Sequence, residues 1–178
     1  MLFRSLRKGL KDAGFPHVPV ISLNAAGVEK NPGFKFTYPI IKKSLMALVY
    51  GDLLMRVLYR VRPYEVIEGS ANLLYDKWVK VCKKAVAEGK KKDFKNNITG
   101  IVSDFDLLEI RDIIKPKVGL VGEILVKFDP IANNNIIDVI EKEGGEAVMP
   151  DLIDFFLYCA YDADFKYKYL RSEERRVG

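Results

Sequence analysis

The stretch 117–150 constrains the fold most, because it carries the complete pattern of one strand–helix–strand unit. A short apolar run at 118–121 predicts a buried strand, and apolar residues at helical spacing follow at 136–140. Gly144 is expected to end that helix, and "EAVM" predicts a second strand. Since a helical crossover joins the two strands, we expect them to be parallel and the connection to be right-handed.

The chain before this unit carries mainly helical patterns. A first helix is expected at 2–13, and a long apolar periodicity predicts a helix at 38–61. Gly51 falls inside that pattern, where glycine costs about 1 kcal/mol relative to alanine, so we expect a close helix contact or a kink there. "HVPVISLN" predicts one strand, which Pro19 confines to an edge or to pairing beyond the proline.

Two further helices are expected before the strand–helix–strand unit. Ser70 is the predicted cap of the first, and Gly89 is its predicted end. "KKKDFKNN" is polar and follows this end, and the next helix is predicted within 98–114.

Together these patterns predict an α/β chain of two regions. Residues 1–115 form a mainly helical section with one strand, and residues 116–170 form the start of a Rossmann-like parallel βαβ domain that is incomplete. The last residues, 171–178, read "RSEERRVG" and break the composition abruptly. They are expected to be a non-native tail that makes no stable contacts.

Composition narrows the classes of protein. The chain has 178 residues, of which 49% are hydrophobic, so it can bury a core. Its net charge of +5 is too modest and too dispersed to indicate nucleic acid binding. No apolar run reaches the ~18 residues of a membrane span. Two distant cysteines without metal-ligand spacing are typical of a cytoplasmic protein.

The candidate site is the loop that follows the first strand of the unit. Gly122 lets the backbone approach a ligand closely, and Glu123 and Lys127 add charge. Asn133 or Asn134 is expected to cap the following helix, whose amino end attracts anions. In parallel sheets ligands bind beyond the carboxyl ends of the strands, which favours binding here. The alternative is a simple corner with a good helix cap, because no glycine-rich nucleotide motif is present.

Other chemistry-bearing residues have simpler interpretations. "RVRPYE" contains Arg60 and Arg62, which could clamp an anion, but a helix-ending ion pair with Glu65 is favoured. His17 is interpreted as a loop histidine. Cys82 and Cys159 are both interpreted as buried helix residues. For Cys159 the alternative is a position near a cofactor of a neighbouring domain. A lysine cluster is interpreted as a solvated face, with binding of nucleic acid or an acidic partner left open; it comprises Lys83, Lys84, Lys90, Lys91, Lys92 and Lys95.

Long pieces of the chain resemble one family. "VGLVGEILVKFDPIANNNIIDVIEKEGGEAVMPDLIDFFLYCAY" is similar to acyl-CoA dehydratase activase-related proteins of the 2-hydroxyacyl-CoA dehydratase family. "FPHVPVISLN", "ALVYGDLLMRVLYRVRPYE" and "LYDKWV" resemble the same family in the same order, so that the likeness covers residues 2–170. The resemblance implies that the chain is an internal fragment of a larger protein.

The resemblance also implies a chemistry for that parent protein. Its relatives join an ATPase activase domain to a dehydratase-like part that carries a [4Fe–4S] cluster and handles 2-hydroxyacyl-CoA by ATP-driven reduction. A cluster needs three or four cysteine ligands, so this chain with two cysteines is expected to bind no cluster and to be inactive alone. The expected partners are the rest of the parent and the ATPase domain, with acyl-CoA as a candidate ligand. The alternative is a non-catalytic domain that docks the ATPase module to its electron acceptor, or, less favoured, a small nucleotide-binding domain.

Overall fold

A computed structural model of the chain describes residues 2–18, 20 and 37–169. The chain divides into two compact units, one made of residues 1–37 with 172–178 and the other of residues 38–171. In the first unit, α1 (Leu2–Asp12) ends one residue before the predicted position. Gly14 follows it with a φ of +86°, and Phe15 N donates to Leu10 O at 2.8 Å, which closes the helix.

The predicted strand "HVPVISLN" falls largely outside the described residues. His17 and Val18 are described, and they lie in a turn and a bend, both exposed, so no strand begins there. Most of the remaining residues of that stretch are not among those described, and the same holds for the predicted tail at 171–178.

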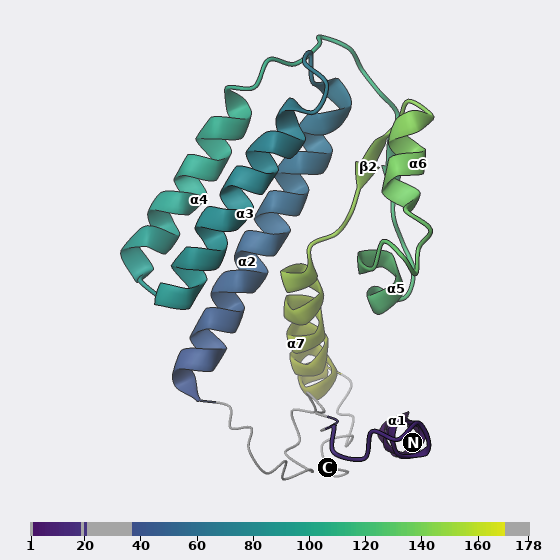
Figure 1. Ribbon diagram of the computed structural model, residues 1–178. Helices are drawn as coiled ribbons and strands as arrows, with labels where there is room; N and C mark the ends of the chain where they lie inside the picture. Colours follow the sequence, from purple (N-terminus) through teal and green to yellow (C-terminus); the bar gives the residue numbers. More distant parts are fainter. Residues whose placement is uncertain (1, 19, 21–36, 170–178) are drawn as a thin grey trace. The chain divides into compact units, whose positions relative to one another are not determined.

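The second unit is built on three long helices that lie side by side (Figure 1): α2 (Tyr38–Val61), α3 (Ser70–Glu88) and α4 (Lys91–Asp106). The bounds of α2 confirm the predicted helix at 38–61. Gly51 is an exposed position of this helix, and a Cβ added there would meet nothing within 4 Å. The expected close contact at Gly51 is therefore wrong.

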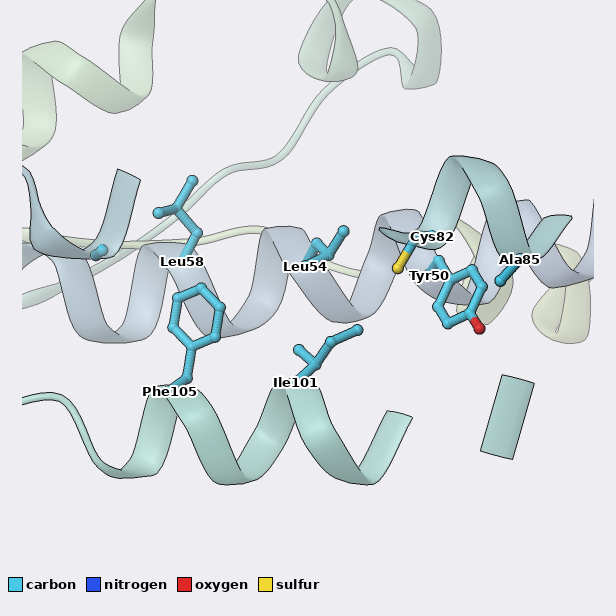
Figure 2. Close-up of a cluster of buried hydrophobic side chains, with 8 residues drawn as sticks. Tyr50, Leu54, Leu58, Cys82, Ala85, Ile101 and Phe105 are labelled. Atoms are coloured by element: carbon cyan, nitrogen blue, oxygen red, sulfur yellow. The ribbon is translucent and has the colours of Figure 1, made fainter. Parts of the chain in front are cut away.

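The core of the three-helix array forms where the apolar stripes of the helices meet (Figure 2). The ring of Phe94 packs edge-on against Tyr50 with 5.0 Å between ring centroids. Ile101 and Phe105, one turn apart on α4, are at most 2% exposed. Burying such side chains contributes about 1.5–3 kcal/mol each, which makes this cluster the main source of cohesion. Its buried members are Tyr50, Leu54, Leu58, Ala71, Cys82, Ala85, Ile101 and Phe105.

The start of α3 differs from the prediction. Ser70 is its first residue, but the cap comes from Glu65, whose carboxylate accepts hydrogen bonds from Gly69 N at 2.7 Å and Ala71 N at 2.8 Å. A carboxylate at a helix amino end satisfies free N–H groups and suits the helix dipole. The predicted end of α3 is confirmed, since Gly89 adopts a φ of +70°.

The helix predicted within 98–114 is displaced toward the amino end, because α4 begins at Lys91 and ends at Asp106. The polar stretch "KKKDFKNN" is helical because its single aromatic residue, Phe94, faces the core while its lysines face solvent. Beyond α4 the chain is extended, and Arg111 N donates to Tyr64 O at 2.7 Å. This segment pairs in antiparallel fashion with the residues after α2 through the bridge Glu65–Ile110. The pairing takes the place of the helical turns that were predicted up to residue 114.

The strand–helix–strand prediction is confirmed in its essentials. Strand β1 (Lys117–Gly119) pairs in parallel with β2 (Glu146–Val148), and Val118 is opposite Ala147. Both strands are shorter than predicted, and the connection contains a short helix, α5 (Ile124–Phe128), before α6 (Ile136–Lys142).

The described residues form this one two-stranded sheet within a mostly helical chain. The fold is therefore a helix-rich α/β arrangement, and the expected Rossmann-like domain is not found. Residues 38–171 cluster as one unit, and the region boundary expected near residue 115 lies inside it, on the segment between α4 and β1.

Among the three long helices, α2 makes the main contact with the sheet region (Figure 1). Tyr59 of α2 packs against a small second core formed by Leu120, Ile137 and Ala147. A short helical turn, η1 (Arg62–Tyr64), follows α2. The hydroxyl of Tyr64 in this turn donates to Glu146 Oε2 at 2.6 Å, which reinforces the contact with the sheet region.

The last helix, α7 (Leu152–Tyr169), is joined to α2 by polar contacts at its first turn. Asp52 of α2 accepts hydrogen bonds from the first backbone N–H groups of α7, and Arg56 of α2 forms an ion pair with Asp151. Beyond that turn the described side chains of α7 are mostly exposed. No helix in the described parts of the chain is both long and apolar enough to cross a membrane.

Candidate functional site at the carboxyl ends of the strands

A cavity of about 390 Å³ lies between the α5–α6 loop and the facing surfaces of α2 and α3. Its walls include Met149, which directly follows β2, and Asn135, which begins α6. The amino end of the crossover helix and the carboxyl end of a parallel strand meet on the same edge of the sheet. The cavity thus occupies the edge at which α/β proteins bind ligands.

Of the four candidate residues, Asn133 alone is on the wall of this cavity. Its Nδ2 donates to Lys127 O at 2.9 Å, and its Oδ1 accepts from Ile136 N at 3.3 Å. Asn133 therefore satisfies the first N–H of α6 with its side chain and also ties the loop to α5, although the N-cap position itself is occupied by Asn135 and not by either of the two predicted residues. This double role fixes the shape of the cavity wall.

Asn134 does not cap the helix. It adopts a φ of +57°, and Asn135, at the N-cap position, adopts +53°. Left-handed conformations are open to asparagine at modest cost, which explains the run of three asparagines in structural terms. The expected anion site at the amino end of α6 is weakened, because α6 has only 7 residues and its first N–H is bound by Asn133.

Gly122 and Glu123 lie at the beginning of the loop and outside the cavity walls. Gly122 is exposed with a φ of +140°, and a Cβ there would meet open space, so backbone conformation and not crowding selects glycine. The Glu123 carboxylate accepts from Val126 N at 2.9 Å and caps α5. Its charge already has a local structural role.

The residues that complete the cavity come from α2 and α3 and were not among the predicted site residues. Tyr59 and Arg62 lie near the end of α2, and Asn72, Tyr75 and Asp76 lie on the first turns of α3. "RVRPYE" was the available signal, but sequence spacing alone could not bring it to a loop more than 60 residues away.

Arg62 is the best-connected charged group of the cavity. Its guanidinium makes a two-point contact with Glu141, Nε to Oε2 at 2.7 Å and Nη2 to Oε1 at 3.0 Å, and it approaches Asp138 at 3.3 Å. Burial alone lowers the pKa of Arg62, but the hydrogen bond and charge of Glu141 outweigh it and raise the pKa, so the group stays protonated. The favoured interpretation of this motif as an ion pair is thus right in kind, although the partner is Glu141 and not Glu65.

The charges around the cavity balance. Arg62 and Lys127 supply two cations, and Asp76 and Asp138 supply two carboxylates. Since Arg62 is already paired, little positive charge remains for a phosphate. Amide and aromatic side chains dominate the rest of the polar wall, and apolar residues including Leu58, Phe128 and Met149 line the remainder. The site therefore suits a ligand with neutral amide groups better than a polyanion.

The cysteines do not fit a cluster site. Cys82 is 5% exposed on α3, and burial raises the pKa of its thiol to about 11, so the thiolate that a metal requires is disfavoured. Cys159 is exposed on α7, contrary to the prediction that it is buried. Among the described residues no three metal-ligating side chains gather at one place. The two cysteines of the sequence are fewer than the three or four that usually hold a [4Fe–4S] cluster.

Comparisons with known proteins found no match for the chain, whether against family models, curated proteins or solved structures.

Proposed function

We propose that this chain is part of an acyl-CoA-handling protein akin to the 2-hydroxyacyl-CoA dehydratases, and that its cavity binds the pantetheine arm of the thioester. The observation that carries the proposal is a charge-balanced wall that is rich in amides, with Asn72 and Asn135 beside Asn133, whose own amide is engaged within the loop. Pantetheine has two amide groups on a flexible apolar arm, and asparagine side chains can donate to and accept from such groups.

The size of the cavity supports an arm and not a whole coenzyme. About 390 Å³ is at the lower end of the range for pockets that hold small molecules, roughly 300–1,000 Å³. The phosphates and the nucleotide would remain outside, because Arg62 is already paired with Glu141 and Asp138, and Lys127 is a single cation facing several negative charges. The cluster and the ATPase that the family resemblance implies would belong to other parts of the parent protein, and no reaction step is assigned to this chain.

Calorimetric titration with CoA and its pieces tests the proposal. Pantetheine should bind and adenosine diphosphate should not. Asn72→Trp adds a bulky ring to the cavity wall at an exposed helix position, so it should abolish pantetheine binding without unfolding the chain. Asn72→Ala should weaken binding about fivefold by removing one hydrogen bond.

The matched control is Asn96→Ala, an exposed asparagine on α4, which should leave the affinity unchanged. The proposal fails if pantetheine does not bind, or if Asn72→Trp leaves its affinity intact.

A second candidate function is a non-catalytic domain that docks an activase-type ATPase to its electron acceptor. The observation that favours it is α7, on which Tyr158, Tyr161 and Tyr169 are each 65–71% exposed. Aromatic side chains gathered on one exposed helix are typical of an interface. If this function is right, the double variant Tyr158→Ser with Tyr161→Ser should abolish co-purification with an activase-type ATPase. Its pantetheine binding should be unaffected.

A further inference from the structure

One end of the three-helix array gathers nine lysines from three helices. We call residues 38–46 and 80–97 the lysine end, because the start of α2, the end of α3 and the start of α4 meet there. Its lysines are Lys42, Lys43, Lys80, Lys83, Lys84, Lys90, Lys91, Lys92 and Lys95. The sequence cluster contained six of them. Lys80 lies one turn earlier on α3, and folding adds Lys42 and Lys43 from α2.

The charge of the chain is concentrated at this end. Nine lysines against two carboxylates, Glu88 and Asp93, give the lysine end a net charge of +7. The whole chain carries +5, so the remaining residues together carry −2. The weak overall basicity thus hides a strongly polarised molecule, whose lysine end creates a positive field of the kind that steers partners.

Some of these charges are fixed in place. Lys42 Nζ donates to Gly89 O at 2.8 Å, and Lys43 Nζ donates to Ala87 O at 2.5 Å, so both ammonium groups satisfy the carboxyl end of α3. Lys90 pairs with Glu88 at 2.9 Å. Within the described parts of the chain, the remaining six lysines form no ion pair within 4 Å, and all six are exposed.

Apolar side chains on α2 border the lysines. Ile41 is 45% exposed and Leu45 is 53% exposed, one turn apart on the same side of the helix. Helix α4 also begins inside the lysine end without a side-chain cap, so its dipole adds to the positive field. An apolar strip beside a set of exposed cations is the arrangement that an acidic amphipathic segment complements.

We propose that the lysine end is a docking surface for an acidic, amphipathic helix of a partner protein. Carboxylates of the partner would pair with lysines of α3 and α4, and its apolar side would cover Ile41 and Leu45. Nucleic acid is less well matched, since the lysine end has no arginine and carries the rings of Tyr38 and Phe94 alone, with Phe94 turned into the core. A membrane surface needs no charges fixed by hydrogen bonds, whereas Lys42 and Lys43 are held in position.

The test uses the full chain and a synthetic helical peptide with glutamate and leucine at helical spacing as the probe. Affinity is measured by fluorescence anisotropy at several salt concentrations, because pairing between exposed charges weakens as the Debye length shortens. The double variant Lys91→Glu with Lys95→Glu should weaken binding about tenfold or more. Glutamate near the amino end of α4 suits the helix dipole, so the variant should remain folded.

The matched control is the double variant Arg111→Glu with Lys142→Glu, which replaces two exposed cations outside the lysine end and changes the net charge by the same amount. It should change the affinity by less than about twofold if position and not total charge matters. Equal weakening by both double variants would overturn the proposal. So would tighter binding of duplex DNA or of phosphatidylserine vesicles than of the peptide at the same salt concentration, and so would no peptide binding at all.

Discussion

The carboxylate of Asp52, in the middle of α2, caps the amino end of α7 by accepting hydrogen bonds from the backbone N–H groups of Leu152 at 3.0 Å and Ile153 at 2.8 Å. Asp52 is 7% exposed, so water cannot replace it at this position. A side chain 100 residues away thus decides where the last helix begins.

Replacing Asp52 should therefore loosen α7 selectively. Asp52→Ala is expected to cost about 1–2 kcal/mol, the usual value of a helix cap, and to speed amide exchange in α7 while α3 and α4 stay protected. Hydrogen-exchange mass spectrometry measures both regions together. Asp76→Ala, at an exposed position on α3, is the control and should leave α7 unchanged. Equal exchange in α7 for both variants would show that the cap contributes nothing.

Two glycines in long helices should respond to alanine in opposite directions. A Cβ at Gly100 of α4 would lie 2.7 Å from Cη2 of Trp78, whereas a Cβ at Gly51 of α2 would meet nothing. Gly100→Ala should destabilise the fold by about 1–3 kcal/mol because two helices must separate. Gly51→Ala should stabilise it by about 0.5–1 kcal/mol through helix propensity. Urea unfolding of the two variants checks this, and a shift in the same direction for both contradicts it.

The free energy of unfolding should depend on pH because of Asp151. Burial is the largest influence on this carboxyl and raises its pKa, Arg56 acts in the opposite direction, and Asp52 raises the pKa again, with a net rise. The folded state then holds a proton at pH values where the unfolded chain has lost it. The stabilisation that Asp151 contributes to the folded state is fully present below its ordinary pKa of about 4. It is lost as the pH rises through the raised pKa that Asp151 has in the folded state.

Comparison with Asp151→Asn isolates this effect. The free energy of unfolding of the unmodified chain minus that of the variant should fall as the pH rises from about 4. Urea titrations at successive pH values measure the difference. The exposed Asn96 of α4 gives the control, since Asn96→Ala removes no titratable group and its difference from the unmodified chain should not vary with pH. A difference that grows with pH for Asp151→Asn would reverse the sign and contradict the structure.

The two cysteines should differ sharply in reactivity. Cys82 is 5% exposed and its pKa is raised to about 11 by burial, whereas Cys159 is exposed on α7. Iodoacetamide at neutral pH should therefore label Cys159 and leave Cys82 unmodified until the chain is unfolded, because the thiolate is the reactive form. Peptide mapping after brief labelling identifies the site. Prompt modification of Cys82 in the folded chain would mean that α3 is not packed as described.

Local patterns could predict the elements whose signals are local. The periodicity of 38–61 gave α2 with its observed bounds, and the apolar runs around 120 and 147 gave the parallel strands. Patterns failed where a distant residue decided the outcome. Phe94 makes a polar stretch helical by packing on Tyr50, and Glu65 caps α3 in place of Ser70.

The candidate site could be predicted only in part for the same reason. Asn133 was within reach of sequence reasoning because it acts on the loop and helix next to it. Tyr59, Arg62 and Asn72 reach the cavity through the packing of α2 and α3 on the sheet region, and no spacing rule encodes that packing. Glu123 and Asn134 were selected for their chemistry, whereas capping and a left-handed turn account for them.

The binding of pantetheine in the cavity is tested most directly by amide NMR spectra of the isotopically labelled chain during titration with pantetheine. Binding at the proposed site should shift the backbone signals around Asn72, Lys127 and Asn133, and these shifts should saturate together and vanish in Asn72→Trp. Signals of the lysine end should stay unchanged, since pantetheine has no phosphate. Shifts confined to other parts of the chain, or no shifts at all at millimolar pantetheine, would contradict the proposed function.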